Sequence, residues 1–363
     1  MAPPRERNQP LKGRGALSNP TGRFERHQRE AVDDGWYQQE VPDFIPTSID
    51  PDRARSVIAR NDSPDIPFEQ SINPYRGCSH GCGYCYARPS HSYVGLSPGL
   101  DFETRLFYKK DAGKVLEEEL AKPGYVCKPI TLGANTDPYQ PIERRMRVTR
   151  EILEVLTRCR HPVTIITKSA LVLRDLDLLT DLAGDGLAGV GISVTTLDVE
   201  LKRAMEPQAA SPHARLEAMR RLNEAGVPTG VLVAPVIPAL TDHEMEAILD
   251  AAAAAGARWA GYVLLRLPHE VKDLFREWLA AHYPDRAEHV MSLVRQMRGG
   301  KDYDPAFGQR MRGTGPLAEL LRGRFHVACR RLGLVTGRQQ PPDTSLFTAP
   351  RRPNASPQLE LEL

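Results

Sequence analysis

The sequence predicts an α/β fold in which six parallel strands form an open, partial (β/α)6 barrel, with a disordered N-terminal arm and a helical C-terminal extension. Two observations lead to this fold class. Short β-branched segments recur along the chain, and helix-like segments separate them at a spacing of roughly 25–40 residues. Such repeats form right-handed βαβ units with a parallel sheet. Six units are fewer than the eight of a closed barrel, which suggests an open one; that the sheet curls rests on the resemblance described below.

Six segments have the β-branched and apolar character of buried strands. They cover residues 72–77, 130–132, 163–167, 190–194, 231–234 and 262–265. Helix signals lie between them. Ser211 followed by Pro212 is typical of an N-cap and a first helical residue. Thr241 with Glu244 predicts a capping box before an alanine-rich helix that ends at Gly256. In such α/β structures, ligands bind at the carboxyl ends of the strands.

Composition divides the 363 residues into four parts. Residues 1–45 are rich in Pro, Gly and basic side chains, lack periodicity and are expected to form a disordered basic arm. Residues 46–270 hold the barrel, and residues 271–338 form a helical extension. Residues 339–363 contain five prolines and are expected to form a flexible tail.

The net charge of +2 says little about partners, but the arm and the stretch from 295 to 338 are both basic. Arg310, Arg312 and Arg324 in the second stretch either reach an anionic substrate or form a solvated face, as charged helix residues commonly do. No run of 18 apolar residues occurs, so no membrane span is expected. The N-terminus lacks the apolar core of a secretory signal. We therefore expect a cytoplasmic protein, whose thiols stay reduced.

Three of the six cysteines lie within eight residues, which is typical of a ligand cluster and not of a disulfide framework. Cys78, Cys82 and Cys85 follow a CxxxCxxC spacing, with glycines between them that allow a tight loop. Thiolates are the usual ligands of iron–sulfur clusters, and three ligands leave one iron open. The alternative is a Cys3His zinc site that uses His80 or His91, although the second ligand pair usual in structural zinc sites is missing.

This cysteine loop, with Tyr84 as the aromatic residue before the third cysteine, resembles the motif of the radical S-adenosylmethionine (radical SAM) superfamily. The segment from Leu132 to Glu143 and several later strand ends resemble relatives of spore photoproduct lyase, also called DNA-repair-photolyase-like proteins. The resemblance implies a 4Fe–4S cluster whose open iron binds SAM. One electron, from a reductant such as flavodoxin or ferredoxin, would cleave SAM to a 5′-deoxyadenosyl radical that abstracts hydrogen from a substrate.

By the same resemblance, five residues at expected strand ends contact SAM: Thr136, Asp137, Lys168, Ser193 and Thr195. Hydroxyl and carboxylate groups can bind the amino group and ribose of SAM, and a lysine can pair with its carboxylate. Each residue alone also suits an ordinary turn, strand or surface position. Their shared place at strand ends favours a site.

One position departs from the lyase pattern. Where the lyase has its hydrogen-donating cysteine, this chain has Ala134, and none of Cys127, Cys159 and Cys329 takes that place. The resemblance therefore implies the broad class of reaction but not thymine-dimer repair by that route. No residue is assigned as catalytic.

The sequence-based hypothesis is a radical SAM enzyme acting on an unidentified substrate. Nucleic acid is favoured as that substrate by the two basic segments and by the resemblance. Two alternatives belong to other classes: an iron–sulfur electron-transfer protein that does not use SAM, and a zinc-stabilised nucleic-acid-binding module. The sequence does not indicate an oligomeric state.

Overall fold

The computed structural model describes residues 10–25, 45–337 and 342–351. Its main sheet has eight strands: β2 (Ile58–Arg60), β3 (Gln70–Ile72), β6 (Ile130–Leu132), β7 (Val163–Thr167), β8 (Ala188–Ser193), β9 (Thr229–Val236), β10 (Trp259–Leu264) and β11 (Val335–Thr336). Their order is β11-β10-β9-β8-β7-β6-β3-β2. The strands from β3 to β11 run parallel, while β2 is antiparallel at the edge. The expected open (β/α)6 barrel is therefore confirmed by β3 and β6 to β10.

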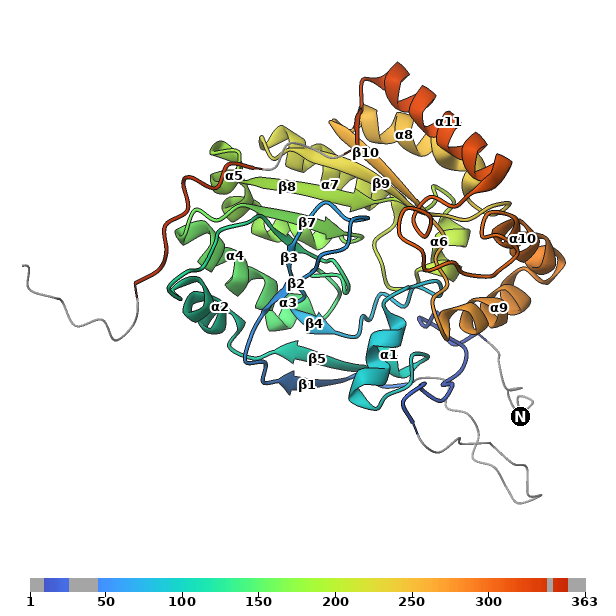
Figure 1. Cartoon of the computed structure of the whole chain (residues 1–363), viewed down its shortest axis with the longest axis horizontal. Helices are drawn as coiled ribbons and strands as arrows, with labels where there is room; N and C mark the ends of the chain where they lie inside the picture. The colour runs from blue at the N-terminus through green and yellow to red at the C-terminus, as the bar shows by residue number, and fades with distance from the viewer. Residues whose placement is uncertain (1–9, 26–44, 338–341, 352–363) are drawn as a thin grey trace, which may run out of the picture.

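Helices cover the outer face of this sheet (Figure 1). Those between strands are α2 (Ala112–Leu120), α4 (Val148–Arg158), α5 (Leu176–Gly184), α7 (Pro212–Glu224) and α8 (Met245–Ala254). The C-terminal part adds α9 (Val271–His282), α10 (Pro284–Gln296) and α11 (Gly315–Leu332). Shorter ones are η1 (Arg88–Val94), α1 (Asp101–Thr104), α3 (Glu143–Met146), η2 (Ala170–Asp175), α6 (Val199–Met205) and η3 (Asp242–Glu244). No helix in the described ranges is long and apolar enough to cross a membrane.

The core lies between the outer face of the sheet and these helices. Side chains alternate between the two faces of a strand, and those that face outward, such as Ile165, Val190 and Val231, are at most 1% exposed. They belong to one cluster with helix residues such as Leu179 and Ile248. Each such side chain contributes roughly 1.5–3 kcal/mol through burial. The helix layer excludes water from these strand side chains. This burial stabilises the β-branched segments as strands.

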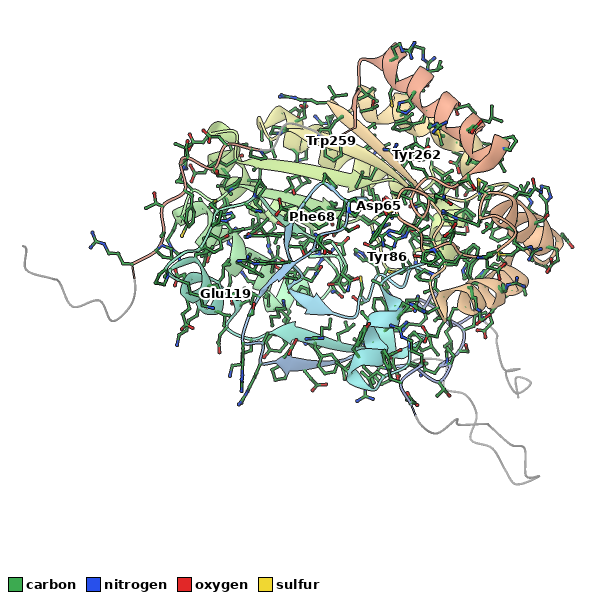
Figure 2. The ribbon with its side chains drawn as sticks, viewed as in Figure 1. Asp65, Phe68, Tyr86, Glu119, Trp259 and Tyr262 are labelled. Atoms are coloured by element: carbon green, nitrogen blue, oxygen red, sulfur yellow. The ribbon has the colours of Figure 1, made fainter. Side chains whose placement is uncertain are left out.

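Small residues line the inner face of the barrel, and Trp259 packs on them (Figure 2). A Cβ atom on Gly230 would lie 2.0 Å from Trp259 Cδ2, and one on Gly191 would lie 2.8 Å from Trp259 Cη2. The strands β6 and β7 carry polar groups instead: the hydroxyls of Thr131 and Thr164 are hydrogen-bonded to each other at 2.9 Å. The glycines in the β-rich segments thus make room for an aromatic ring inside the barrel.

The two predicted helix starts have different outcomes. Ser211 caps α7 as predicted, since its Oγ accepts a hydrogen bond from the Ala214 N–H at 3.2 Å. The capping box of Thr241 and Glu244 is wrong. The Thr241 hydroxyl accepts from the Ile237 N–H at 2.9 Å, and α8 begins only at Met245, after the turn η3. The Thr241 hydroxyl and the Glu244 carboxylate, which a capping box requires, are instead bonded to residues outside the helix.

A second, three-stranded sheet was not predicted. It consists of β1 (Ser48–Asp52), β5 (Arg105–Lys109) and β4 (Tyr75–Arg76), in the order β1-β5-β4. The expected first strand at 72–77 is therefore split, because its end pairs antiparallel with β5 and leaves the barrel. In Figure 1 this sheet lies at the bottom of the view, below the barrel.

Part of the expected N-terminal arm is packed against the protein. Residues 1–9 and 26–44 of the arm lie outside the described residues, but 10–25 run beside α1 and α9 (Figure 1). Leu11 and Ala16 are 7% and 3% exposed and pack with Leu100 and Leu274. This segment departs from the expected disorder because its few apolar residues, sparse in sequence, meet a preformed apolar surface.

Residues 342–351 of the expected tail also make contacts. The Phe347 ring lies 5.5 Å from that of Tyr125 and 5.3 Å from that of His161, measured between centroids. The Thr348 N–H donates to the Cys159 carbonyl at 2.9 Å. The rest of this tail, beyond residue 351 and at 339–341, lies outside the described residues.

Two loops meet across the open side of the barrel. The loop 61–69 precedes β3, near one edge of the sheet, and the loop 303–314 lies near β10 at the other. Arg310 Nε donates to Asp65 Oδ2 at 2.5 Å, and the Gly308 N–H donates to Asp65 Oδ1 at 2.6 Å (Figure 2). Arg324 is likewise paired with Glu246 at 2.6 Å. Of the three arginines considered for anion binding, two thus have carboxylate partners within the protein.

Candidate active site

The three clustered cysteines lie in a loop that follows β4 and is held by backbone hydrogen bonds. Gly77 and Gly81 adopt φ values of +72° and +69°, which L side chains rarely adopt. The Cys78 N–H donates to the Phe102 carbonyl at 2.9 Å, and the Cys85 N–H donates to the Cys82 carbonyl at 3.2 Å. The local sequence therefore sets the tight turns, and distant backbone groups fix the loop in place.

A buried ion pair also holds the cysteine loop in place. Arg88 and Glu103 are both fully buried and paired. Arg88 also donates to the Cys82 carbonyl, through Nη2 at 2.8 Å and Nε at 3.0 Å. The Glu103 carboxylate accepts from the N–H groups of Gly15 and Ala16 at 3.0 and 2.8 Å. The packed N-terminal segment and the cysteine loop are thus connected through one carboxylate and one guanidinium.

The segment after β6 holds the other side of the loop. Gln140 is fully buried, and its side-chain amide donates to the Gly77 carbonyl at 3.1 Å and accepts from the Ser79 N–H at 2.9 Å. The Gly83 N–H donates to the carbonyl of Met205, the last residue of α6, the helix after β8. Because both supports lie beyond the carboxyl ends of barrel strands, the cysteines are at the ligand-binding end of the barrel.

The three thiols are close enough to influence one another. Cys78 and Cys82 are 7% and 9% exposed, and Cys85 is half-buried. Burial is the main reason why the pKa of Cys82 is raised to about 12, with Glu206 adding to it; the pKa of Cys78 is also raised by burial and by nearby Asp137, Cys82 and Cys85. Metal binding must therefore displace protons from these thiols.

The donor set suits an iron–sulfur cluster. Within the described ranges, no three His, Cys, Asp or Glu side chains are grouped tightly enough to hold a single metal ion. A cluster is larger, since each cysteine binds a different iron. The two histidines considered for zinc have protein partners: His80 Nδ1 lies 3.4 Å from Asp137 Oδ2, and His91 Nε2 lies 2.9 Å from the Arg105 carbonyl. The three thiols are therefore the ligands that this loop offers.

Thr136 and Asp137, two of the residues expected to contact SAM, connect neighbouring segments. The Thr136 hydroxyl donates to the Tyr75 carbonyl at 2.7 Å, just before the cysteine loop. The Asp137 carboxylate accepts from the Thr167 hydroxyl and from the Lys168 N–H, both at 2.7 Å. These polar groups therefore fix the ends of β4, β6 and β7 relative to one another.

Lys168 lies at the end of β7 and extends toward the cysteine loop. Its Nζ is 5.9 Å from the centroid of the Tyr84 ring. Burial by itself lowers the pKa of Lys168, but negative charge on Cys82 and Glu206 outweighs it, so the pKa is raised. Among the residues the structure describes, Nζ has no hydrogen-bond or ion-pair partner. A charged ammonium group is thus held near the thiols and free to bind an anion.

Ser193 and Thr195 lie at the end of β8, beside a buried ion pair that sequence reasoning missed. Glu206 and Arg215 are at most 1% exposed and paired. Thr195 Oγ1 lies 2.8 Å from Glu206 Oε1, and the Ser193 carbonyl accepts from Arg215 Nη1 at 3.0 Å. The Tyr84 hydroxyl donates to the same carboxylate. Glu206 is in the Met-Glu-Pro segment after β8, but nothing local signals its burial.

The five expected SAM contacts therefore come together at the ends of three adjacent strands. Thr136 and Asp137 follow β6, and Lys168 follows β7. Ser193 ends β8, and Thr195 follows it. Ala134 lies in the same region, where its carbonyl accepts a hydrogen bond from the Tyr86 hydroxyl. The other cysteines do not share this place, since Cys329 lies in α11 and Cys159 ends α4.

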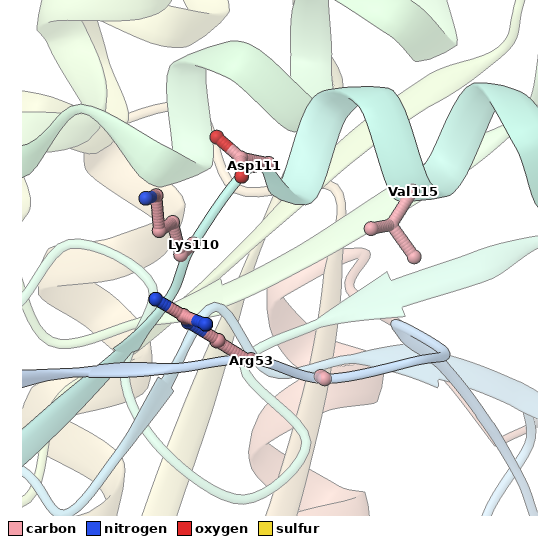
Figure 3. A pocket seen from close by; sticks show the side chains of 5 residues that line it. Arg53, Lys110, Asp111 and Val115 are labelled. Atoms are coloured by element: carbon pink, nitrogen blue, oxygen red, sulfur yellow. The ribbon is translucent and has the colours of Figure 1, made fainter.

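One surface hollow lies elsewhere. Arg53, Lys110, Asp111 and Val115 line it where β1 and β5 end and α2 begins (Figure 3). None of these residues belongs to the cysteine loop or to the barrel strand ends. We assign no role to this hollow.

The fold and the site together define a class: an α/β protein with three clustered thiols at the carboxyl ends of an open barrel. Comparison with known families specifies it further, because the radical SAM superfamily model matches residues 72–252. The chain therefore belongs to the radical SAM superfamily, and it is a radical SAM enzyme.

The chain also has relatives of similar sequence. An uncharacterized protein of Mycobacterium tuberculosis is 36% identical over 249 residues, which cover 68% of this chain and 72% of that protein. An uncharacterized protein of Methanocaldococcus jannaschii is 29% identical over 222 residues, covering 60% and 78% of the two chains.

Solved structures of spore photoproduct lyase share the fold. The complex with dinucleoside spore photoproduct has a TM-score of 0.57 at 16% identity, over 79% of this chain and 80% of that one. A mutant with bound AdoMet and the same dinucleoside has a TM-score of 0.56 at 17% identity, over the same shares. At this level of identity the likeness concerns the fold alone.

Proposed function

We propose that this enzyme holds a 4Fe–4S cluster through Cys78, Cys82 and Cys85 and uses it to cleave SAM reductively. The observation that supports this proposal is the loop itself. Three thiols are held by backbone and buried side-chain bonds at the ligand-binding end of the barrel, next to the unpaired ammonium group of Lys168. Three cysteine ligands leave the fourth coordination position free for SAM.

When bound, the reduced cluster with SAM supplies a 5′-deoxyadenosyl radical for hydrogen abstraction. The residues of the chain bind and orient. Lys168 pairs with the SAM carboxylate, since among the described residues its Nζ has no partner within hydrogen-bond or ion-pair distance. Ser193 and Thr195 line the adjacent strand end, while Thr136 and Asp137 contribute mainly by fixing the segments that surround the cofactor. We also propose a cytoplasmic location with flavodoxin or ferredoxin as electron donor.

The proposed substrate contains nucleotide. Support comes from the basic segments of the chain and from the dinucleoside bound in a protein of the same fold. Because Ala134 has no thiol to return hydrogen, the proposed reaction is not thymine-dimer repair by the cysteine route. Phosphate contacts make binding fall steeply with salt. Binding of single-stranded DNA should therefore weaken between low and physiological salt; no binding at low salt would contradict this substrate class.

Anaerobic reconstitution with iron and sulfide tests the cluster. The protein should turn brown and hold about four irons per chain. Alanine at any one of Cys78, Cys82 and Cys85 should abolish this, whereas Cys127→Ala and Cys329→Ala serve as matched controls and should not. Zinc in the loop after reconstitution would favour the nucleic-acid-binding alternative.

Reductive cleavage tests the use of SAM. With dithionite, the reconstituted enzyme should convert SAM slowly to 5′-deoxyadenosine. Lys168→Ala should weaken SAM binding and keep the iron content, because Lys168 contacts no cluster ligand through a hydrogen bond. A cluster without SAM cleavage would favour the electron-transfer alternative.

A further inference from the structure

We propose that Arg266, at the carboxyl end of β10, binds a phosphate group of the substrate, with Arg298 beside it. This inference rests on the proposed function and adds a residue that selects the substrate. It starts from the position of Arg266. Its guanidinium Cζ lies 4.7 Å from the centroid of the Tyr86 ring, and Tyr86 directly follows Cys85 (Figure 2). Arg266 is therefore at the same end of the barrel as the cysteine loop.

The charge of Arg266 has no partner of opposite sign in the described part of the chain. Its Nε is buried without a hydrogen-bond partner. Its Nη1 reaches only the thioether sulfur of Met311, at 3.5 Å, and a thioether is a weak acceptor. Arg266 is half-buried, and its buried Nε is cut off from water without gaining a protein acceptor, which is costly because that N–H is then solvated by neither. An incoming anion would remove this cost.

Arg298 adds a second positive charge at the same place. It is 2% exposed, and it donates to the carbonyl of Leu265, the residue before Arg266, at 2.8 Å, and to that of Gln309 at 2.7 Å. Burial is the main reason why the pKa of Arg298 is lowered; the nearby charge of Arg266 also lowers it, while Tyr303 and Asp304 act in the opposite direction. Within the described ranges no carboxylate forms an ion pair with either arginine.

Two buried arginines elsewhere in this protein have a carboxylate partner. Arg88 is paired with Glu103, and Arg215 is paired with Glu206. These two arginines thus carry their own counter-ion, whereas neither Arg266 nor Arg298 forms an ion pair with a carboxylate among the described residues. The planar fork of a guanidinium matches the oxygens of phosphate in a bidentate manner, and two charges favour a phosphate over a singly charged carboxylate.

The tyrosine ring defines where the anion sits. Tyr86 is held in place because its hydroxyl donates to the Ala134 carbonyl, and its face covers one side of the Arg266 guanidinium. The in-plane N–H groups of Arg266 lack a strong acceptor, since Nε is buried without a partner and Nη1 reaches only the Met311 sulfur. A phosphate bound there would place the attached group beside the cysteine loop, where hydrogen abstraction takes place in the proposed function.

Calorimetric titration of the reconstituted full-length enzyme with inorganic phosphate tests this subsite. The wild type should bind phosphate. Arg266→Gln should bind it about tenfold more weakly or worse, the loss expected for a charge-assisted bidentate contact. Arg266→Lys, which keeps the charge but not the fork, should lie between. Arg324→Gln, which changes the net charge equally at a paired arginine on α11, should match the wild type.

The outcomes separate the two proposals. Equal phosphate affinity in the wild type and Arg266→Gln, with iron content confirming that both variants are folded, overturns the subsite. Loss of SAM affinity without loss of phosphate affinity also overturns it, and would assign Arg266 to the cofactor carboxylate. The proposed function fails separately, if the wild type itself does not cleave SAM.

Discussion

Removing the charge of Glu206 should destabilise the protein strongly, although this residue is neither a cluster ligand nor an expected SAM contact. Burial by itself raises the pKa of Glu206, but Arg215, Lys168 and the hydrogen bond from Tyr84 outweigh it and lower the pKa from 4.5 to about 2. Each pKa unit corresponds to about 1.4 kcal/mol, so the ionised carboxylate contributes about 3 kcal/mol at pH 7. Breaking a buried ion pair from one side costs about 3–5 kcal/mol, which agrees.

The substitution Glu206→Gln keeps the shape and leaves the Arg215 charge buried. Arg215 would retain only the carbonyls of Ala210 and Ser193, at 2.9 and 3.0 Å. The assay is urea unfolding of the cluster-free protein at pH 7, where we expect a loss of about 3 kcal/mol. Because the folded pKa is below the unfolded value, the contribution of Glu206 is complete above pH 4.5 and is lost as the pH falls toward 2.

Two further variants make this test specific. Glu217→Gln breaks an exposed ion pair with Arg220 on the same helix as Arg215 and should leave the unfolding free energy unchanged. Replacing both Glu206 and Arg215 by leucine and methionine should recover much of the loss, because no charge is then left buried. If Glu206→Gln unfolds within about 0.5 kcal/mol of the wild type, the ion pair does not stabilise the site as reasoned here.

Three other predictions concern the supports of the site and the core. Glu103→Ala leaves a fully buried arginine unpaired and should lower the iron content after reconstitution as well as stability by about 3–5 kcal/mol; normal iron content would contradict its role under the loop. Gly230→Ala should destabilise by about 1–3 kcal/mol in urea unfolding because its Cβ meets the Trp259 ring, while Gly189→Ala, with 3.8 Å to the nearest atom, is the tolerated control. Burial lowers the pKa of His161 from 6.5 to about 4. The free energy of unfolding of the wild type should therefore fall by at most about 3 kcal/mol as the pH is lowered from 6.5 to 4, because His161 must then be protonated in the unfolded state first. An equal fall in His161→Gln would refute this.

The sequence by itself determined the elements that depend on local pattern. β-Branched segments predicted the six barrel strands, because burial against helices selects such residues wherever a parallel sheet forms. Ser211 predicted its helix start, because an N-cap needs only its own neighbours. The cysteine loop could be predicted for the same reason, since CxxxCxxC with glycines is a local arrangement of ligands and turns.

Features that depend on distant partners were decided by the tertiary structure. The second sheet, the packing of residues 10–25 and the loss of the Thr241 capping box all involve groups far apart in the chain. The same holds in the site. Asp137 and Thr136 were expected as ligand contacts, yet their polar groups are satisfied by neighbouring segments. Whether a polar side chain is a support or a free ligand depends on which partners reach it.

Charge shows this difference most clearly. From the sequence, Arg310 and Arg324 could not be told apart from Arg266, and the basic C-terminal stretch drew attention to the first two. In the folded protein they are paired with Asp65 and Glu246, while Arg266 has no counter-ion among the described residues. The sequence determined which charges exist, but only folding decided which of them remain unpaired, because ion pairing acts over a few ångströms between residues that can be hundreds of positions apart.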